Sequence, residues 1–236
     1  MTKPRALSCA ILSLFIYFAQ NVLSSLLIGT FDMGTFESRL ISSLIAICFL
    51  ALLIKSKERA KYFGICSLRT NKEILLCLPL FLMPLINLLY AILPDVVGFG
   101  IATSVVVAIF TGIIEEFIFR GFLFRAIEER ATPIKAIIIS SVVFGLFHFV
   151  NLTAWPVEFV ILQVIYATAI GISFAIVFHI TQSILPCIII HVLVNAGGVF
   201  FVEDMRLEIE AVGMVVLILI AVFYSTILHK YKTKQY

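Results

Sequence analysis

Long apolar segments alternate with short polar connections along the whole chain. A helix needs about 20 predominantly apolar residues to span a bilayer core, and segments of this kind predict eight membrane helices. They cover approximately residues 6–29, 38–54, 74–93, 100–120, 134–152, 157–178, 183–202 and 211–229. We expect the fourth helix to continue to about Glu129. The pattern therefore predicts an all-α, polytopic membrane protein with a single domain, residues 1–236.

Composition supports a membrane protein. Apolar residues make up 62% of the 236 residues and charged residues only 13%, and the mean hydropathy is +1.15. A soluble fold of this length has too few core positions for so many apolar side chains. The net charge of +3 is small, and no basic stripe with interleaved aromatic residues suggests a nucleic-acid partner. The five cysteines show no CxxC or metal-ligand spacing, so we expect them to be small apolar residues in membrane helices or loops.

The first apolar segment follows Lys3 and Arg5, as in a secretory signal peptide. Its length of about 23 residues exceeds a signal's apolar region, and no small-residue cleavage site follows it. We therefore expect it to be a retained membrane helix.

The connections carry an asymmetric charge. Of the 17 Lys and Arg residues, all except Arg39 and Arg206 fall on one side of the eight predicted helices, and this count includes Arg120. The positive-inside rule assigns that side to the cytoplasm. We expect a multi-pass protein of the cell membrane with both termini in the cytoplasm. The acidic residues predicted on the other side are Asp32, Glu37, Asp95, Glu158, Glu203, Asp204, Glu208 and Glu210.

Three ionisable residues, Glu115, Glu116 and Arg120, lie in the fourth apolar segment. Each costs a few kcal/mol within a membrane helix on insertion scales. Glu116 and Arg120 are four residues apart and can pair along one helix face. Glu115 points about 100° away, has no partner on its own helix and suits a general base. A purely structural alternative is an ion pair and a hydrogen-bonded acid that lock two helices together.

Two further predicted helices carry polar residues. His148 lies in the fifth, one turn after Phe144, and His191 and Asn195 lie on one face of the seventh. At ~1.5 Å rise per residue, Glu115, His148 and His191 lie roughly 15–21 Å from the predicted cytoplasmic boundary. The alternative is a set of interhelical hydrogen bonds. The other histidines, predicted at helix ends near the interface, are His179 and His229.

These residues form three ordered motifs on three predicted membrane helices. EExxxR matches Glu115, Glu116 and Arg120, FxxxH matches Phe144 and His148, and HxxxN matches His191 and Asn195. With these motifs the sequence resembles the type II CAAX prenyl endopeptidase family of intramembrane proteases, also called the Abi or bacteriocin-processing CAAX protease family. The motifs span residues 115 to 195, and the family-like catalytic region covers approximately 100–200.

The resemblance implies an endopeptidase that cuts within or next to the membrane. It implies that Glu115 activates a water with the help of His148. His191 and Asn195 would bind the water, a metal or the oxyanion of the tetrahedral intermediate. The substrate would be a membrane-anchored protein or peptide: eukaryotic members trim three terminal residues from prenylated CAAX proteins, and bacterial members are associated with peptide maturation and bacteriocin immunity.

For Glu116 and Arg120 the resemblance implies that they hold the fourth helix in place. The family is commonly labelled as metalloprotease, so zinc bound by Glu115, His148 and His191 is one mechanism, because zinc lowers the pKa of bound water to about 7. Glu116 or the bound water itself would then supply the base. The chain lacks HExxH, the usual zinc-protease signature, and a metal-free mechanism with Glu115 as base is equally open.

Two other classes of function compete with a protease. A non-catalytic membrane scaffold or immunity protein would keep the fold and the polar core, but it would not depend on the Glu115 carboxylate. A proton-coupled transporter would be expected to show internal repeats, whereas the buried ionisable residues here all follow residue 110. The small-residue pair Ala167 and Gly171 fits packing between chains or within one chain, so the oligomeric state stays open.

Overall fold

The computed structural model describes residues 6–85, 100–153, 155–198 and 207–233, and within these ranges helices are the only regular elements. The all-α class is therefore confirmed. The elements are α1 (Ala6–Phe31), α2 (Thr35–Leu53), α3 (Lys57–Tyr62), α4 (Asn71–Cys77), η1 (Leu78–Phe81), α6 (Gly100–Glu116), η2 (Phe117–Phe124), α7 (Arg125–Glu128), α8 (Pro133–Phe147), η3 (His148–Thr153), α9 (Val157–Thr181), α10 (Leu185–Gly198) and α11 (Leu207–Thr233).

Four helical segments among the described residues are long and apolar enough to cross a membrane: α1, α2, α8 with η3, and α9. They correspond to the first, second, fifth and sixth predicted segments. The apolar stretches of α10 and α11, Leu185–Gly197 and Val212–Thr226, are shorter. The third predicted segment, 74–93, is described only as far as residue 85. α6, η2 and α7 run without interruption from Gly100 to Glu128, as predicted for the fourth segment.

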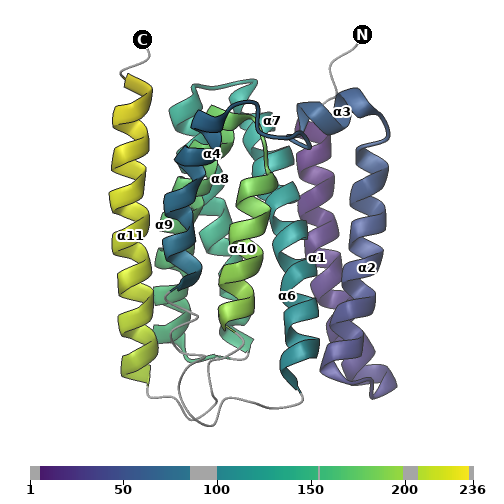
Figure 1. Ribbon diagram of the computed structural model, residues 1–236. Coiled ribbons are helices and arrows are strands. Elements are labelled where there is room, and N and C mark those ends of the chain that lie inside the picture. Colours follow the sequence, from purple (N-terminus) through teal and green to yellow (C-terminus); the bar gives the residue numbers. More distant parts are fainter. Residues whose placement is uncertain (1–5, 86–99, 154, 199–206, 234–236) are drawn as a thin grey trace.

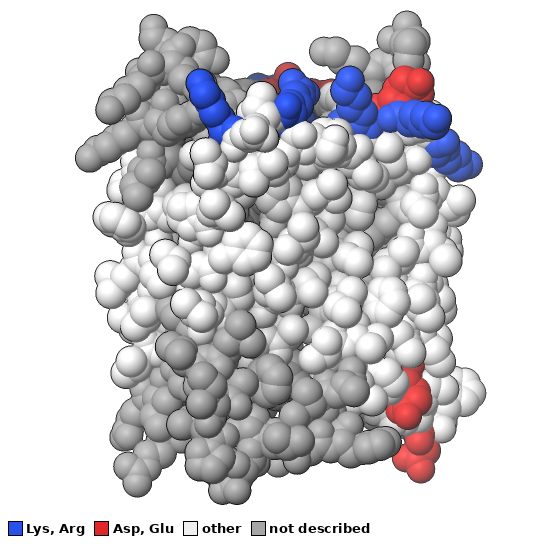
Figure 2. All heavy atoms as spheres, viewed as in Figure 1, with Lys and Arg blue, Asp and Glu red and all other residues white. Residues whose placement is uncertain are grey.

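The bundle is apolar on its outside and polar at selected interior positions. Phe15, Phe18 and Phe31 on α1 are each 65% or more exposed. Figure 2 shows a broad band without charged side chains between the two ends of the bundle. An apolar surface of this extent is rare on a soluble monomer, whereas lipid solvates it and the helices satisfy their own backbone hydrogen bonds. The fold is therefore that of a multi-pass membrane protein.

Lys and Arg side chains gather at one end of the bundle, where α3 and α7 lie, and acidic side chains mark the opposite end near the start of α2 (Figure 2). We call the first of these the basic end. α1 begins and α11 ends there (Figure 1). Arg120, which the charge count assigned to this end, is instead buried in the interior with 1% exposure. The side chain of His229 lies outside the described residues.

Close helix packing depends on glycine at two contacts. A Cβ added to Gly112 on α6 would lie 3.0 Å from Val192 Cγ2 and 3.2 Å from Val192 N on α10. A Cβ added to Gly145 on α8 would lie 2.7 Å from the carbonyl oxygen of Val164 on α9. Small residues allow membrane helices to approach this closely. Gly112 thus lets α6 and α10, which carry the first and third motifs, pack closely, and Gly145 lets α8, which carries the second, pack closely on α9.

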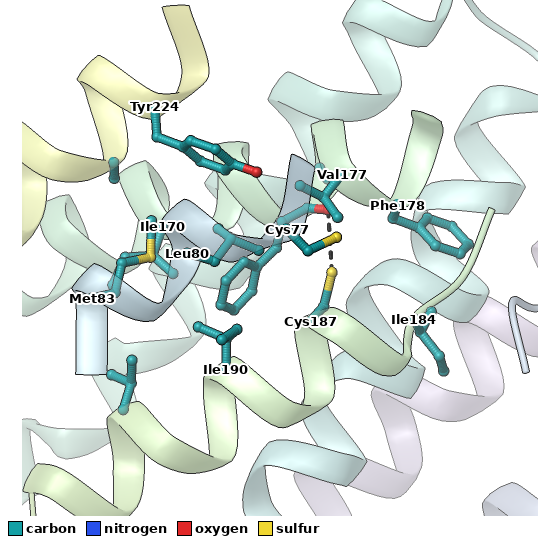
Figure 3. Close-up of a cluster of buried hydrophobic side chains, with 14 of the residues drawn as sticks. Cys77, Leu80, Met83, Ile170, Val177, Phe178, Ile184, Cys187, Ile190 and Tyr224 are labelled. Atoms are coloured by element: carbon teal, nitrogen blue, oxygen red, sulfur yellow. Dashed lines mark hydrogen bonds between the residues drawn. The ribbon is translucent and has the colours of Figure 1, made fainter. Parts of the chain in front are cut away.

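A buried apolar cluster joins α4 and η1 to α9, α10 and α11 (Figure 3). Leu80 from η1 is fully buried within it. Cys77 from α4 and Cys187 from α10 lie in the same cluster, and both are free thiols, as are the other three cysteines. The Cys187 thiol donates to the carbonyl oxygen of Phe174, 3.4 Å away. The cluster fixes the first half of α10, which leads to His191.

Arg125 joins α7 to two other parts of the basic end. Its guanidinium donates to the carbonyl oxygen of Tyr62 at 3.0 Å, to Glu128 at 2.7 Å and to Gln182 Oε1 at 2.6 Å. His179 at the end of α9 hydrogen-bonds Glu128 at 2.8 Å. Burial alone would raise the pKa of Glu128, but the His179 hydrogen bond and the Arg125 guanidinium outweigh it, so this pKa is lowered. The contacts tie α3 to the α9–α10 turn.

Candidate active site

The three charged residues of the first motif lie inside the bundle. Glu115 and Glu116 end α6, and Arg120 lies in η2, where the hydrogen bonding changes from α to π type. π-Helical segments within α-helices are frequent at functional sites. The residues are 5%, 0% and 1% exposed, respectively. All three side chains are thus buried within the bundle, away from the lipid-facing surface.

Glu116 joins two helices through one carboxylate oxygen. Its Oε1 accepts from Arg120 Nη1 at 2.9 Å and from His191 Nδ1 at 2.7 Å. Because a carboxylate only accepts, His191 carries a proton on Nδ1. The predicted pairing of Glu116 with Arg120 is confirmed, and it extends to α10. Among the described residues, Glu116 Oε2 and Arg120 Nη2 have no hydrogen-bond partner.

Aromatic rings hold the Arg120 guanidinium on two sides. Its Cζ lies 4.4 Å from the ring centroid of Phe144 on α8 and 5.4 Å from that of Phe174 on α9. Both separations are within cation–π range. Gly171 makes room for this group, since a Cβ there would lie 3.2 Å from Arg120 Nη2 and 3.2 Å from the Phe144 ring. Gly171 therefore packs within the chain, against the site, as does Ala167 with 2% exposure.

Glu115 has partners on two other helices. The Tyr17 hydroxyl on α1 donates to Glu115 Oε1 at 2.8 Å. On the other side, His191 Nε2 lies 3.4 Å from Glu115 Oε2. The structure thus brings together a carboxylate and an imidazole from the predicted set, and it adds a tyrosine from the first helix.

His148 lies where α8 ends and the 3₁₀ turn η3 begins, rather than within a regular helix as predicted. Its Nδ1 is 3.0 Å from the carbonyl oxygen of Phe144, so Nδ1 donates there. It is close enough to Glu115 and His191 to interact electrostatically with both. In both histidines Nδ1 is held by the protein, and this leaves Nε2 for other atoms.

Asn195 lies one turn after His191 on α10 and is partly buried. Tyr17, in contrast, was not predicted as a site residue because the first helix carries no motif. A signal for it exists in the sequence, since Ser13, Tyr17 and Gln20 place three polar residues on one face of an apolar segment. Polar residues within membrane helices usually face the bundle interior.

The predicted zinc ligands are only partly arranged for a metal. A protein hydrogen bond at Nδ1 is typical of metal-binding histidines, and His148 and His191 both have one. Among the described residues, however, no three His, Cys, Asp or Glu side chains form a group that could hold a metal ion. The arrangement of Glu115, His148 and His191 therefore does not fit a three-ligand metal site. Zinc stays a prediction, and no catalytic step below passes through it.

Residues 97–197 match the model of a protein family described as type II CAAX prenyl endopeptidase Rce1-like. The matched region contains all the residues of the three motifs and confirms the resemblance seen in the sequence. It supports, as a general class, a membrane endopeptidase of the CAAX protease type. No curated protein matches the chain.

Proposed function

We propose that this protein is an intramembrane endopeptidase that hydrolyses peptide bonds in membrane-associated proteins or peptides. The observation that carries the proposal is the buried Glu115 carboxylate, which lies beside His191 Nε2 and within electrostatic reach of His148. A general base buried among hydrogen-bonding imidazoles suits peptide hydrolysis, which needs an activated water and a stabilised oxyanion.

In the proposed mechanism Glu115 Oε2 takes a proton from a water molecule, and His148 helps to orient that water. The water oxygen attacks the peptide carbonyl carbon, and the carbonyl oxygen becomes an oxyanion. The Asn195 amide donates a hydrogen bond to it, and His191 Nε2, which has no proton when Nδ1 carries it, accepts a hydrogen bond from the attacking water. When the C–N bond breaks, Glu115 returns the proton to the leaving amine. The atoms and charges of the hydrolysis balance in this scheme.

Glu116 and Arg120 have a supporting role in the proposal. Glu116 fixes the tautomer and orientation of His191, and Arg120 compensates the charge of Glu116. An isolated buried charge is costly, and the Arg120 guanidinium, 2.9 Å from Glu116 Oε1, offsets the cost of burying this carboxylate.

The proposed arrangement in the membrane has eight crossings, with the catalytic groups on the fourth, fifth and seventh helices. The basic end would face the cytoplasm, as the positive-inside rule requires, and both termini of this cell-membrane protein would lie there. The substrate would be anchored in or on the same membrane, as a CAAX-type protein or as a peptide involved in maturation or bacteriocin immunity.

A zinc-dependent version of the proposal uses the same residues. Glu115, His148 and His191 would hold the ion after a side-chain rearrangement, and zinc would supply Lewis-acid activation of the water. This version makes the protein a metalloendopeptidase.

The proposal is tested by comparing membrane peptides and protein termini, by mass spectrometry, between host strains. One strain carries the wild-type protein, one carries Glu115→Gln and one carries Glu158→Gln, all at equal abundance. Glu158 is exposed at the start of α9 and serves as the control. Protein termini that are present with the wild type and with Glu158→Gln, but absent with Glu115→Gln, support a protease. If all three strains give the same peptides and termini, while a strain that lacks the protein still has a phenotype, the scaffold is favoured instead.

A further inference from the structure

Tyr17 contacts the proposed base from outside the family-matched region. Its hydroxyl donates to Glu115 Oε1 at 2.8 Å, although the family match covers only residues 97–197. Tyr17 lies on α1 and Glu115 on α6, so 98 positions separate them in the sequence. The contact therefore joins the N-terminal helix to the motif region.

The ring of Tyr17 is held by two phenylalanines. Its centroid lies 6.2 Å from that of Phe119 and 5.5 Å from that of Phe147, in edge-to-face arrangements. Phe119 is fully buried, and its ring also packs against Phe147 at 5.3 Å. Edge-to-face aromatic pairs are favourable and directional. The position of the hydroxyl is thus fixed before any substrate binds.

We propose that Tyr17 is a positioning residue for Glu115, an inference that rests on the proposed function. Its hydrogen bond engages Oε1, which leaves Oε2 on the side of His191 to accept the proton from water. After that proton transfer Oε1 still accepts from the Tyr17 hydroxyl, so the base keeps its orientation through the reaction. A preorganised base of this kind raises the rate of the chemical step.

A purely structural role for Tyr17 makes a different prediction. If the hydroxyl only joined α1 to α6, its loss would lower stability and leave the chemical step of the folded enzyme unchanged. If it positions Glu115, its loss also lowers kcat of the folded enzyme and leaves KM nearly unchanged. Tyr17→Phe separates the two, because the phenylalanine ring keeps both aromatic contacts and removes only the hydroxyl.

A second Tyr–Glu hydrogen bond provides a matched control. The Tyr62 hydroxyl donates to Glu129 at 2.5 Å at the basic end, away from the motif residues. Tyr62→Phe removes the same kind of bond without touching the site. We therefore compare four proteins: wild type, Tyr17→Phe, Tyr62→Phe and Glu115→Gln.

The experiment starts from the termini that depend on Glu115 in the native host. An internally quenched synthetic peptide that spans this cleavage site is then hydrolysed by the full-length enzymes in lipid nanodiscs. For Tyr17→Phe we expect kcat to fall on the order of 10- to 100-fold, with KM within about twofold of wild type. Tyr62→Phe should match wild type within about twofold.

The outcomes separate the two proposals. If no termini depend on Glu115, the endopeptidase and the role of Tyr17 both fall. If wild type cleaves the peptide and Tyr17→Phe keeps wild-type kcat, only the positioning role is overturned. If a smaller folded fraction accounts for the whole loss of activity of Tyr17→Phe, the positioning role is overturned too, because Tyr17 would then be structural.

Discussion

The buried pair of Glu116 and Arg120 makes a quantitative prediction about stability. Three variants test it: Glu116→Gln, Arg120→Met and the double variant. Arg120→Met leaves the Glu116 carboxylate, which is 0% exposed, without its counterion. Glu116→Gln leaves the guanidinium with only the two aromatic rings. Breaking a buried ion pair by removing one partner costs about 3–5 kcal/mol.

The structure supports a value in that range. Glu116 Oε1 accepts two hydrogen bonds, from Arg120 and from His191, and a bond to a charged group contributes about 1.5–3 kcal/mol. The double variant leaves no unpaired charge at this pair, and a methionine fills the space between Phe144 and Phe174. We therefore expect the double variant to be more stable than either single variant, with a coupling energy of about 2–3 kcal/mol.

The assay is equilibrium unfolding in mixed micelles, followed by the intrinsic tyrosine and tryptophan fluorescence. The same samples are assayed for peptide hydrolysis, in which the double variant should stay inactive because glutamine does not hold His191 as a carboxylate does. Additivity of the two single changes within about 0.5 kcal/mol would refute the reasoning, since two groups that form one buried pair cannot act independently.

Three further predictions follow from other parts of the structure. Gly112→Ala should lower the free energy of unfolding by about 1–3 kcal/mol and hydrolysis more than tenfold, because its Cβ would push α6 from α10. Gly29→Ala is the control, since a Cβ there meets nothing within 4 Å, and it should leave hydrolysis unchanged. Thermal unfolding and peptide assays check both variants. A metal-free mechanism predicts that dialysis against a chelator leaves hydrolysis within about twofold, while a loss that only added zinc restores would identify a metalloenzyme. The pKa of Glu128 is lowered in the folded state, so its carboxylate stabilises the protein at pH values above its unfolded pKa of about 4.3. This contribution is lost as the pH falls through the folded pKa. In thermal melts the destabilisation by Glu128→Gln should therefore be present at pH 7 and shrink below about pH 4.

The sequence alone determined the features that depend on neighbours along one helix. Apolar segments predicted the helices, and α1, α2, α8 with η3, and α9 begin and end close to the predicted bounds. A spacing of four residues predicted the pair of Glu116 and Arg120, because residues four apart on an α-helix face the same way. The motifs also predicted that Glu115 and His191 would lie close together, since a polar side chain in a membrane helix is expected to turn toward the bundle interior, and these side chains are 3.4 Å apart.

Only the tertiary structure decided which atoms meet. No local pattern indicates that Glu116 binds His191 or that Phe144 supports Arg120, because these contacts depend on how each helix is rotated and where it crosses its neighbours. Glycines at helix contacts set those crossings, and they act through atoms far away in the sequence. The hydrogen bond from Tyr17 to Glu115 is the clearest case: the first helix carries no motif, and only its packing beside the site brings the hydroxyl to the carboxylate.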